Sequence, residues 1–385
     1  MSLVDFGSIS HIQKGKKPFR QTNVPTEGYS PYVDIEAFET GNIKMYANGE
    51  KCLPCKNGDI LIVCDGSRSG FVGRAIDGYV GSTLAIIKAD GMLPEYLYYF
   101  LQGRYALLNT KKKGTGTPHL DVNVLNQQKL AVPSYKEQKR IVARIEELFS
   151  ELDNGVETLK KTKQKLAVYR QSVLKAAFAV ADAPFRRLEE VCFFITKGTT
   201  PKKAAMSSGT GEIPFIKVYN LTSDNSLDFS INPTFVSEEI HKEFLGRSIV
   251  YPGDVLMNIV GPPMGKVSIV PDTYPEWNIN QAIARFRCLN GLCNKYLAYF
   301  LGYSDTIRKM TSKAKATAGQ FNLTLEICRD IQIPVPPIEE QKQIVVEIES
   351  RLSVCDSIEK AVNAGLQQSE SMRQSILKKA FEGEL

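Results

Sequence analysis

Apolar residues recur at every seventh position along one long stretch of the chain, residues 137–178. Five consecutive rungs at this spacing predict a helix with a coiled-coil seam along one side. At about 1.5 Å per residue, some 40 helical residues would span roughly 60 Å. The predicted seam consists of Ile145, Leu152, Leu159, Leu166 and Val173.

The stretch occurs again, without a gap, as residues 340–381, and 17 of 42 positions are identical. A duplication this regular predicts two copies of one structural unit. The second seam consists of Ile348, Cys355, Val362, Ser369 and Ile376. A companion row, expected three residues after each seam position, is poorer in apolar residues and includes Gly155, Thr162, Arg351 and Lys379. We therefore expect one face of the helices to remain for partner helices.

A block of short apolar runs precedes each long helix. In the first block the runs predict strands over residues 32–35, 59–63 and 84–87, and a helix over 95–108. The second block repeats this order, because GDIL at 58–61 returns as GDVL at 253–256 and LYYFL at 97–101 returns as LAYFL at 297–301. The blocks share little between these anchors, which predicts one fold with two different surfaces.

The connectivity predicts an α+β architecture. Its parts are a first block at 1–133, a spacer helix at 134–180, a second block at 184–333 and a second spacer helix at 334–385. The first helix leads from one block into the other, whereas the second helix leaves the second block and ends the chain. If each block sits on its helix in the same way, a pseudo-twofold axis relates the halves in a circular arrangement. The two helices then pack antiparallel and separate two similar α/β blocks.

Composition narrows the class of protein. No run approaches the ~18 apolar residues of a membrane span, and the beginning of the sequence lacks a secretory pattern, so we expect a cytoplasmic location and no membrane partner. Eight cysteines are then expected to be reduced thiols. The Cys52-Leu-Pro-Cys55 spacing suits a redox dithiol or half a zinc site, but it has no second half, which favours a turn near a strand and no metal.

Catalytic motifs are absent from the sequence. There is no phosphate-binding GxxxxGK[ST], and the string 260–264, VGPPM, lacks the Asn and the aromatic residue of an amine methyltransferase motif. Glu137 and Lys139 have the E-x-K spacing of some nucleases, but an acid in the first turn of a helix is favoured by the helix dipole. We expect no catalytic residue in this chain.

Basic, glycine-containing loops are the more informative feature. The formal net charge is only +6, so the distribution of the cations matters more than their total. Cations on such loops suit phosphate contacts, and neighbouring polar side chains can reach base edges. A single charge cluster is usually a solvated face, and His119 is open to a structural role as well, but the clusters recur at matched places in both blocks. The candidate DNA-binding residues are Lys14, Lys16, Lys17, Arg20, Ser67, Arg68, Ser69, Arg74, Lys111, Lys112, Lys113, His119, Lys197, Lys202, Lys203, Lys266, Lys313, Lys315, Gln320 and Asn322.

The chain resembles the DNA-specificity subunits of type I restriction-modification systems. The motif P-x-x-x-E-Q-K-x-I-V occurs at 133–142 and 336–345, and R-Q-S-[VI]-L-K-x-A-F occurs at 170–178 and 373–381. The string LEEV at 188–191, followed by Lys197-Gly198 and Pro201, is also typical of this family. The resemblance covers the whole chain.

The resemblance implies two target-recognition domains, each reading one half of a split sequence in double-stranded DNA, with the helices as a ruler for the unread gap. It also implies partners: two modification subunits that bind S-adenosylmethionine and methylate adenine, and usually two ATP-dependent restriction subunits. This chain itself would bind no cofactor and would not be an enzyme. The alternative is a protein-interaction scaffold without DNA specificity of its own.

Overall fold

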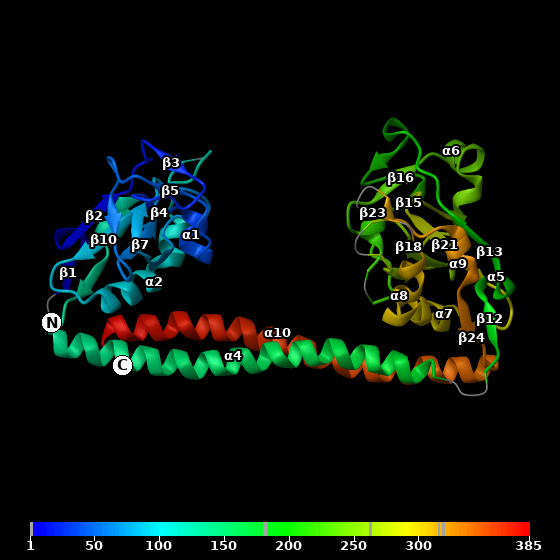
Figure 1. Cartoon of the computed structure of the whole chain (residues 1–385). Helices are drawn as coiled ribbons and strands as arrows, with labels where there is room; N and C mark the ends of the chain where they lie inside the picture. The colour runs from blue at the N-terminus through cyan, green and yellow to red at the C-terminus, as the bar shows by residue number, and fades with distance from the viewer. Residues whose placement is uncertain are drawn as a thin grey trace. The chain divides into compact units, whose positions relative to one another are not determined.

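The computed structural model describes residues 3–114, 116–179, 183–222, 224–261, 264–314, 316–317 and 320–385. The chain forms two compact units. Unit 1 comprises Met1–Lys160 and Asn363–Leu385, and unit 2 comprises Lys161–Val362. Each unit contains one block of strands together with parts of two long helices, α4 (Tyr135–Ala177) and α10 (Ile338–Glu382) (Figure 1).

Unit 1 contains two small sheets. A four-stranded antiparallel sheet has the order β2 (Ser10–Lys14), β10 (Leu84–Ala89), β7 (Ile60–Val63), β8 (Val72–Arg74). A five-stranded sheet has the order β3 (Gln21–Thr22), β5 (Tyr46–Ala47), β4 (Ser30–Val33), β9 (Gly78–Val80), β6 (Pro54–Cys55). β1 (Leu3–Asp5) pairs with β11 (Lys129–Ala131), and the short helices are η1 (Phe6–Ser8), α1 (Ile35–Thr40), α2 (Pro94–Thr110) and α3 (Val122–Asn126).

Unit 2 repeats this topology. Its four-stranded sheet has the order β13 (Cys192–Lys197), β21 (Ile283–Cys288), β18 (Val255–Asn258), β19 (Val267–Ile269), and its five-stranded sheet β14 (Ser207–Ser208), β16 (Thr234–Val236), β15 (Ile213–Ile216), β20 (Trp277–Ile279), β17 (Ile249–Val250). β12 (Phe185–Arg187) pairs with β24 (Gln332–Pro334), and β22 (Ala316–Thr317) with β23 (Gln320–Phe321). The helices are α5 (Leu188–Val191), α6 (Glu238–Glu243), α7 (Asn294–Gly302), α8 (Ser304–Lys313) and α9 (Leu325–Asp330), with 3-10 turns η2 (Lys203–Ala205), η3 (Val218–Asn220) and η4 (Gly246–Ser248). The prediction of two similar blocks is confirmed.

The fully apolar strand β7 explains how each block is layered. Successive side chains of a strand point to opposite faces, so Ile60 and Ile62 join the core that includes α2, while Leu61 and Val63 join the core under the five-stranded sheet. The predicted strands at 59–63 and 84–87 and the helix at 95–108 are therefore confirmed. The predicted strand at 32–35 is only half right: it ends at Val33, because the Asp34 carboxylate accepts from Ala37 N and starts helix α1.

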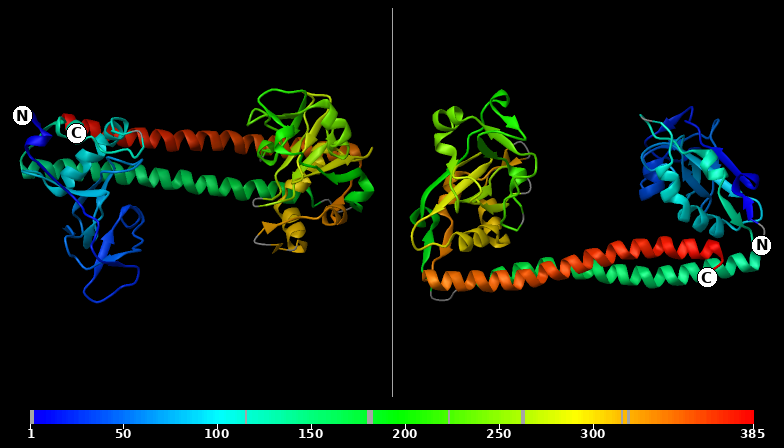
Figure 2. Two further views of the ribbon diagram at one scale, coloured as in Figure 1. Left: turned by 90° about the horizontal axis from the view of Figure 1, so that it is seen from above. Right: turned by 180° about the vertical axis from the view of Figure 1, so that it is seen from behind.

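Each unit takes the start of one long helix and the end of the other into its core. The core of unit 1 includes Ile145 and Phe149 of α4 and Leu377 of α10, and Figure 2 shows these helix parts side by side in two further views. Unit 2 uses the matched residues, including Leu174 of α4 and Ile348 of α10. The predicted antiparallel packing is confirmed within each unit.

Ion pairs between α4 and α10 are consistent with the same antiparallel packing. Arg373 of α10 pairs with Asp153 of α4 in unit 1. In unit 2 the matched residue Arg170 of α4 donates to Asp356 of α10 at 2.6 Å. Both arginine side chains are 26% exposed, so these charged contacts belong to the helix interface.

All ten predicted seam residues are buried or half-buried, but the companion row was predicted on the wrong side. Tyr169, Ile358 and Met372 of the predicted row are 45%, 39% and 46% exposed. The row that accompanies the seam lies four residues after it and includes Phe149 and Arg170. Heptad contacts alternate steps of three and four residues, and one clear row does not reveal which step comes first.

No helix within the described residues is long and apolar enough to cross a membrane.

Candidate nucleic-acid interface

Three basic loops of unit 1 meet at one edge of the four-stranded sheet. We call the described residues 14–20, 64–70, and 111–114 with 116–119 the edge loops of unit 1. Because β10 runs antiparallel to both β2 and β7, the ends of β2 and β7 lie beside the beginning of β10. Gly15 N accordingly donates to Leu84 O at 2.9 Å, and Cys64 N donates to Thr83 O at 2.8 Å. The sheet thereby brings together segments far apart in the sequence.

Asp65 joins the three edge loops. Its carboxylate accepts a hydrogen bond from Lys14 Nζ at 2.7 Å and from His119 Nδ1 at 2.7 Å. Burial raises the pKa of Asp65, but the hydrogen bonds from Lys14 and His119 outweigh it and hold the pKa below its ordinary value. The sequence pattern pointed to cations and uncharged polar residues, and Asp65 was missed. An acid directly after a buried strand, inside a basic loop, is the signal that could have found it.

Further contacts tie the second edge loop to the third. Lys112 Nζ donates to Ser67 O at 3.2 Å, and Gly66 N donates to Pro118 O at 2.8 Å. Ser69 is fully buried and donates from Oγ to Gly66 O at 2.7 Å. Ser69 therefore shapes the loop and is too buried to contact DNA, contrary to its place among the predicted binding residues.

Two predicted arginines are engaged within unit 1. Arg68 pairs with Glu39 at 2.7 Å and lies over the Phe71 ring at 4.1 Å. In the sheet, Arg74 of β8 lies opposite Ile60, the first residue of β7. The edge loops, in contrast, follow the end of β7. Arg74 thus lies at the opposite ends of the strands from the edge loops, and the structure does not bring it close to the other candidates.

The remaining candidate cations of the first block are exposed. Within the residues that the structure describes, no ion pair is formed by Lys16, Lys17, Arg20 or Lys111. Lys113 is exposed too and pairs with Asp121 at 3.0 Å. Exposed cations without a protein partner are suited to phosphate oxygens.

Unit 2 has equivalent edge loops, whose described residues are 197–203, then 259–261 with 264–265, then 313–314 with 316–317 and 320–322. Gly198 N donates to Ile283 O at 3.0 Å, and Ile259 N donates to Ala282 O at 2.8 Å. These two bonds match those of Gly15 and Cys64 in unit 1. The candidates in these loops that are exposed are Lys197, Lys202, Lys203, Lys313 and Asn322.

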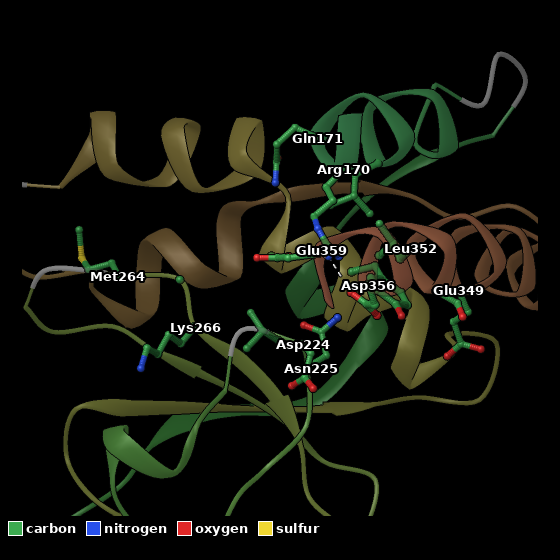
Figure 3. A pocket seen from close by; sticks show the side chains of 16 residues that line it. Arg170, Gln171, Asp224, Asn225, Met264, Lys266, Glu349, Leu352, Asp356 and Glu359 are labelled. Atoms are coloured by element: carbon green, nitrogen blue, oxygen red, sulfur yellow. Dashed lines mark hydrogen bonds and ion pairs between the residues drawn. The ribbon is translucent and has the colours of Figure 1, made fainter. Parts of the chain in front are cut away.

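Three candidates of the second block fall elsewhere. Lys315 and the side chain of Gln320 lie outside the described part of the chain. Lys266 lines a cavity of about 630 Å³ that unit 2 forms between its block and the long helices (Figure 3). The structure therefore does not group Lys266 with the exposed cations.

The cavity contains the interhelical ion pair of unit 2. Figure 3 shows Arg170 directed toward the carboxylates of Asp356 and Glu359, which it contacts at 2.6 and 3.1 Å. Unit 1 has a counterpart of about 430 Å³ that is lined by the matched residues Arg373 and Asp153. Both cavities offer mixed charges and no evident reaction chemistry.

The sequence offered two places where metal or catalytic chemistry was conceivable, the Cys52–Cys55 pair and Glu137. No group of three or more potential metal ligands is found among the described residues. Cys55 is buried and donates from Sγ to Ile76 O at 3.3 Å, and burial together with Asp59 and Asp77 raises its pKa to about 11. A thiol protonated at neutral pH is a poor nucleophile. Glu137 lies in the first turn of α4 and pairs with Arg140 at 2.8 Å, as expected for a structural acid.

Comparison with known proteins places this fold in context. The family described as Type I restriction modification DNA specificity domain matches residues 1–166 and 182–368. The type I restriction enzyme MjaVIII specificity subunit of Methanocaldococcus jannaschii is 24% identical, covering 90% of this chain and 85% of the relative. The EcoBI specificity subunit of Escherichia coli is 25% identical over 92% of this chain and 80% of its own.

Solved structures show the same fold. A chain from a type I R-M system, studied for complex assembly and conformational transition, has a TM-score of 0.77 at 22% identity and covers 100% of this chain and 98% of its own. The HsdS subunit from Thermoanaerobacter tengcongensis has a TM-score of 0.54 at 21% identity, covering 100% of this chain and 97% of its own.

Proposed function

Because the chain belongs to the type I restriction modification DNA specificity family, we propose that the edge loops of its two units read the two halves of a split sequence in double-stranded DNA. The observation that carries this proposal is the recurrence of three edge loops at the same edge of the same sheet in both units. Their exposed cations would contact phosphates, and their uncharged polar side chains would contact bases.

The proposed domains keep the boundaries expected from the sequence. Recognition domains occupy 1–133 and 184–333, and spacer helices occupy 134–180 and 334–385. The edge loops of the two units differ in residue type, so the two half-sites should differ in sequence. The spacer helices would set the length of the unread gap.

The chain itself would be a non-catalytic subunit. Methylation would come from two modification subunits that bind S-adenosylmethionine, and cleavage from two restriction subunits that use ATP and Mg²⁺. In each unit we assign the exposed flank of the long helices to a modification subunit; this flank includes Tyr169 and Ile358 in unit 2 and Met372 in unit 1. Such an assembly would act in the cytoplasm, where its DNA lies.

A domain exchange tests the proposal. Residues 1–133 are replaced by the corresponding block of another specificity subunit, and the sequences bound in a pool of random duplexes are determined for both chains. One half-site is expected to change while the other half-site and the gap persist. Binding should also weaken steeply with salt, because phosphate contacts release counterions.

The scaffold alternative makes the opposite forecast. A chain that only holds other proteins together would enrich no sequence from the pool, and the exchange of a block would change nothing in the DNA readout. The family match does not favour this alternative.

A further inference from the structure

We propose that His119 reads one base pair of the first half-site through Nε2 of its imidazole ring, with Asp65 as the positioning residue that fixes the ring. This inference rests on the proposed function and adds a specific residue pair and its chemistry to it. Three observations carry it: the geometry of the pair, its charge, and the equivalent position in unit 2.

The ring and the backbone of His119 are both held in place. Nδ1 lies 2.7 Å from Asp65 Oδ1, and because an ionised carboxylate only accepts hydrogen bonds, Nδ1 must carry a proton. The backbone N and O of His119 bond to Lys113 at 2.7 and 2.8 Å. Within the described part of the chain, Nε2 is the ring atom left to make a hydrogen bond, and the side chain is 55% exposed.

The charge of the pair favours a base over a phosphate. The Asp65 carboxylate lies directly against the imidazole and repels a phosphate approaching the same ring. Its other oxygen holds Lys14 at 2.7 Å, so this lysine is also partly neutralised. Lys16 and Lys17 are exposed and form no ion pair among the described residues, so they are the cations available to the DNA backbone. A rigid side chain with one outward hydrogen-bonding atom is what readout of a base edge requires.

Unit 2 has an equivalent position, occupied by Asn322. Each of these residues precedes a buried leucine whose N–H bonds to the loop after the central strand. Leu120 N donates to Cys64 O at 2.7 Å, and Leu323 N donates to Ile259 O at 2.8 Å.

The side chains at the equivalent positions differ in a way that fits base readout. The backbone of His119 forms an isolated β-bridge with that of Asp65, and the backbone of Asn322 forms one with that of Val260. The β-bridge partner is therefore an acid in unit 1 and an uncharged residue in unit 2. Asn322 is exposed and uncharged, and asparagine can pair with two atoms of adenine. Both units thus present an uncharged or neutralised hydrogen-bonding side chain at this point. The difference between histidine and asparagine would make the half-sites differ there.

The test uses the full-length chain and a pool of random duplex DNA, with sequencing of the bound fraction. His119→Ala is expected to lose about tenfold or more of the discrimination at one position of one half-site. Asp65→Asn should reduce discrimination at that same position, because the ring loses its fixed orientation. The other positions of that half-site and the whole second half-site should persist, which also shows that both variants are folded.

A matched control exists in the same block. His11 Nε2 and Asp90 Oδ2 form an exposed pair at 2.9 Å, and because His11 lies opposite Lys88 near the end of β10, this pair is at the far edge of the sheet. His11→Ala and Asp90→Asn are expected to leave both half-sites unchanged.

Three results would overturn the inference. They are an unchanged motif in His119→Ala, a uniform loss of affinity for all sequences, which indicates a phosphate contact, and full discrimination in Asp65→Asn. If the unmodified chain enriches no sequence at all, the proposed function fails first, so the two failures can be told apart.

Discussion

Replacing Gln341 with methionine should destabilise unit 2 by about 3 kcal/mol. Its side chain is fully buried. Oε1 accepts from Cys293 N at 2.9 Å, and Nε2 donates to Gly291 O and Pro336 O, both at 2.8 Å. Methionine has a similar shape but leaves these three backbone groups without partners. A buried group without a partner costs about 1–3 kcal/mol. The bond to Pro336 O is buried and the other two are part-buried, so the lower limit for each of the three groups sets the estimate.

The assay is urea unfolding followed by tryptophan fluorescence. The chain has one tryptophan, Trp277, and it is fully buried in unit 2, so its signal reports on the unit that carries the substitution. With a urea dependence of about 2 kcal/mol per M, a loss of about 3 kcal/mol moves the midpoint down by about 1.5 M.

Two variants serve as controls. Gln343→Met changes an exposed residue on the same helix and should leave the midpoint in place. Gln138 is the matched residue of unit 1, with bonds to Leu93 N, Gly91 O and Pro133 O at 2.7, 2.7 and 2.9 Å. Gln138→Met should lower the stability of unit 1 by a similar amount. A midpoint for Gln341→Met equal to that of Gln343→Met would refute the reasoning.

Three further predictions follow from packing and charge. Gly198→Ala should destabilise unit 2, because a Cβ there would lie 2.1 Å from Ile279 O; a Trp fluorescence midpoint equal to that of the unmodified chain would contradict this. Arg373→Asp should weaken the helix pairing of unit 1 by about 1 kcal/mol, and adding Asp153→Arg should restore it, as a double-mutant cycle by thermal unfolding can measure. Burial raises the pKa of Asp65 but its hydrogen bonds hold it below its ordinary value of 3.8, so its contribution to stability is present above that pH and is lost as the pH falls through the lowered value. The stability difference between the unmodified chain and Asp65→Asn, measured by thermal unfolding, should therefore be present at neutral pH and close at strongly acidic pH.

Much of the architecture could be predicted from local patterns. The heptad row from Ile145 to Val173 indicated a long helix, and the apolar run at residues 59–63 indicated a strand. The repeat indicated two similar units and an antiparallel pair of helices. Such features follow from the periodic spacing of apolar residues, which can be recognised within a single stretch of sequence.

The candidate site could be predicted only in part. The basic loops were found because lysine, glycine and arginine cluster in the sequence. Asp65 was missed, Ser69 was taken for a contact although it is buried, and Arg74 was grouped with residues at the opposite edge of the sheet. These errors share one cause: the order of strands in the sheet decides which loops meet.

The sequence by itself determined the duplication, the long helices, the order of the strands along the chain and the family. Only the tertiary structure decided which row of residues accompanies the helix seam. It also decided that the side chains of Gln138 and Gln341 form hydrogen bonds between each long helix and its block. It also brought Lys14, Asp65 and His119 together. The physical reason is that periodicity is a local property, whereas a hydrogen bond between residues 54 positions apart exists only once the sheet has fixed the distance between their loops.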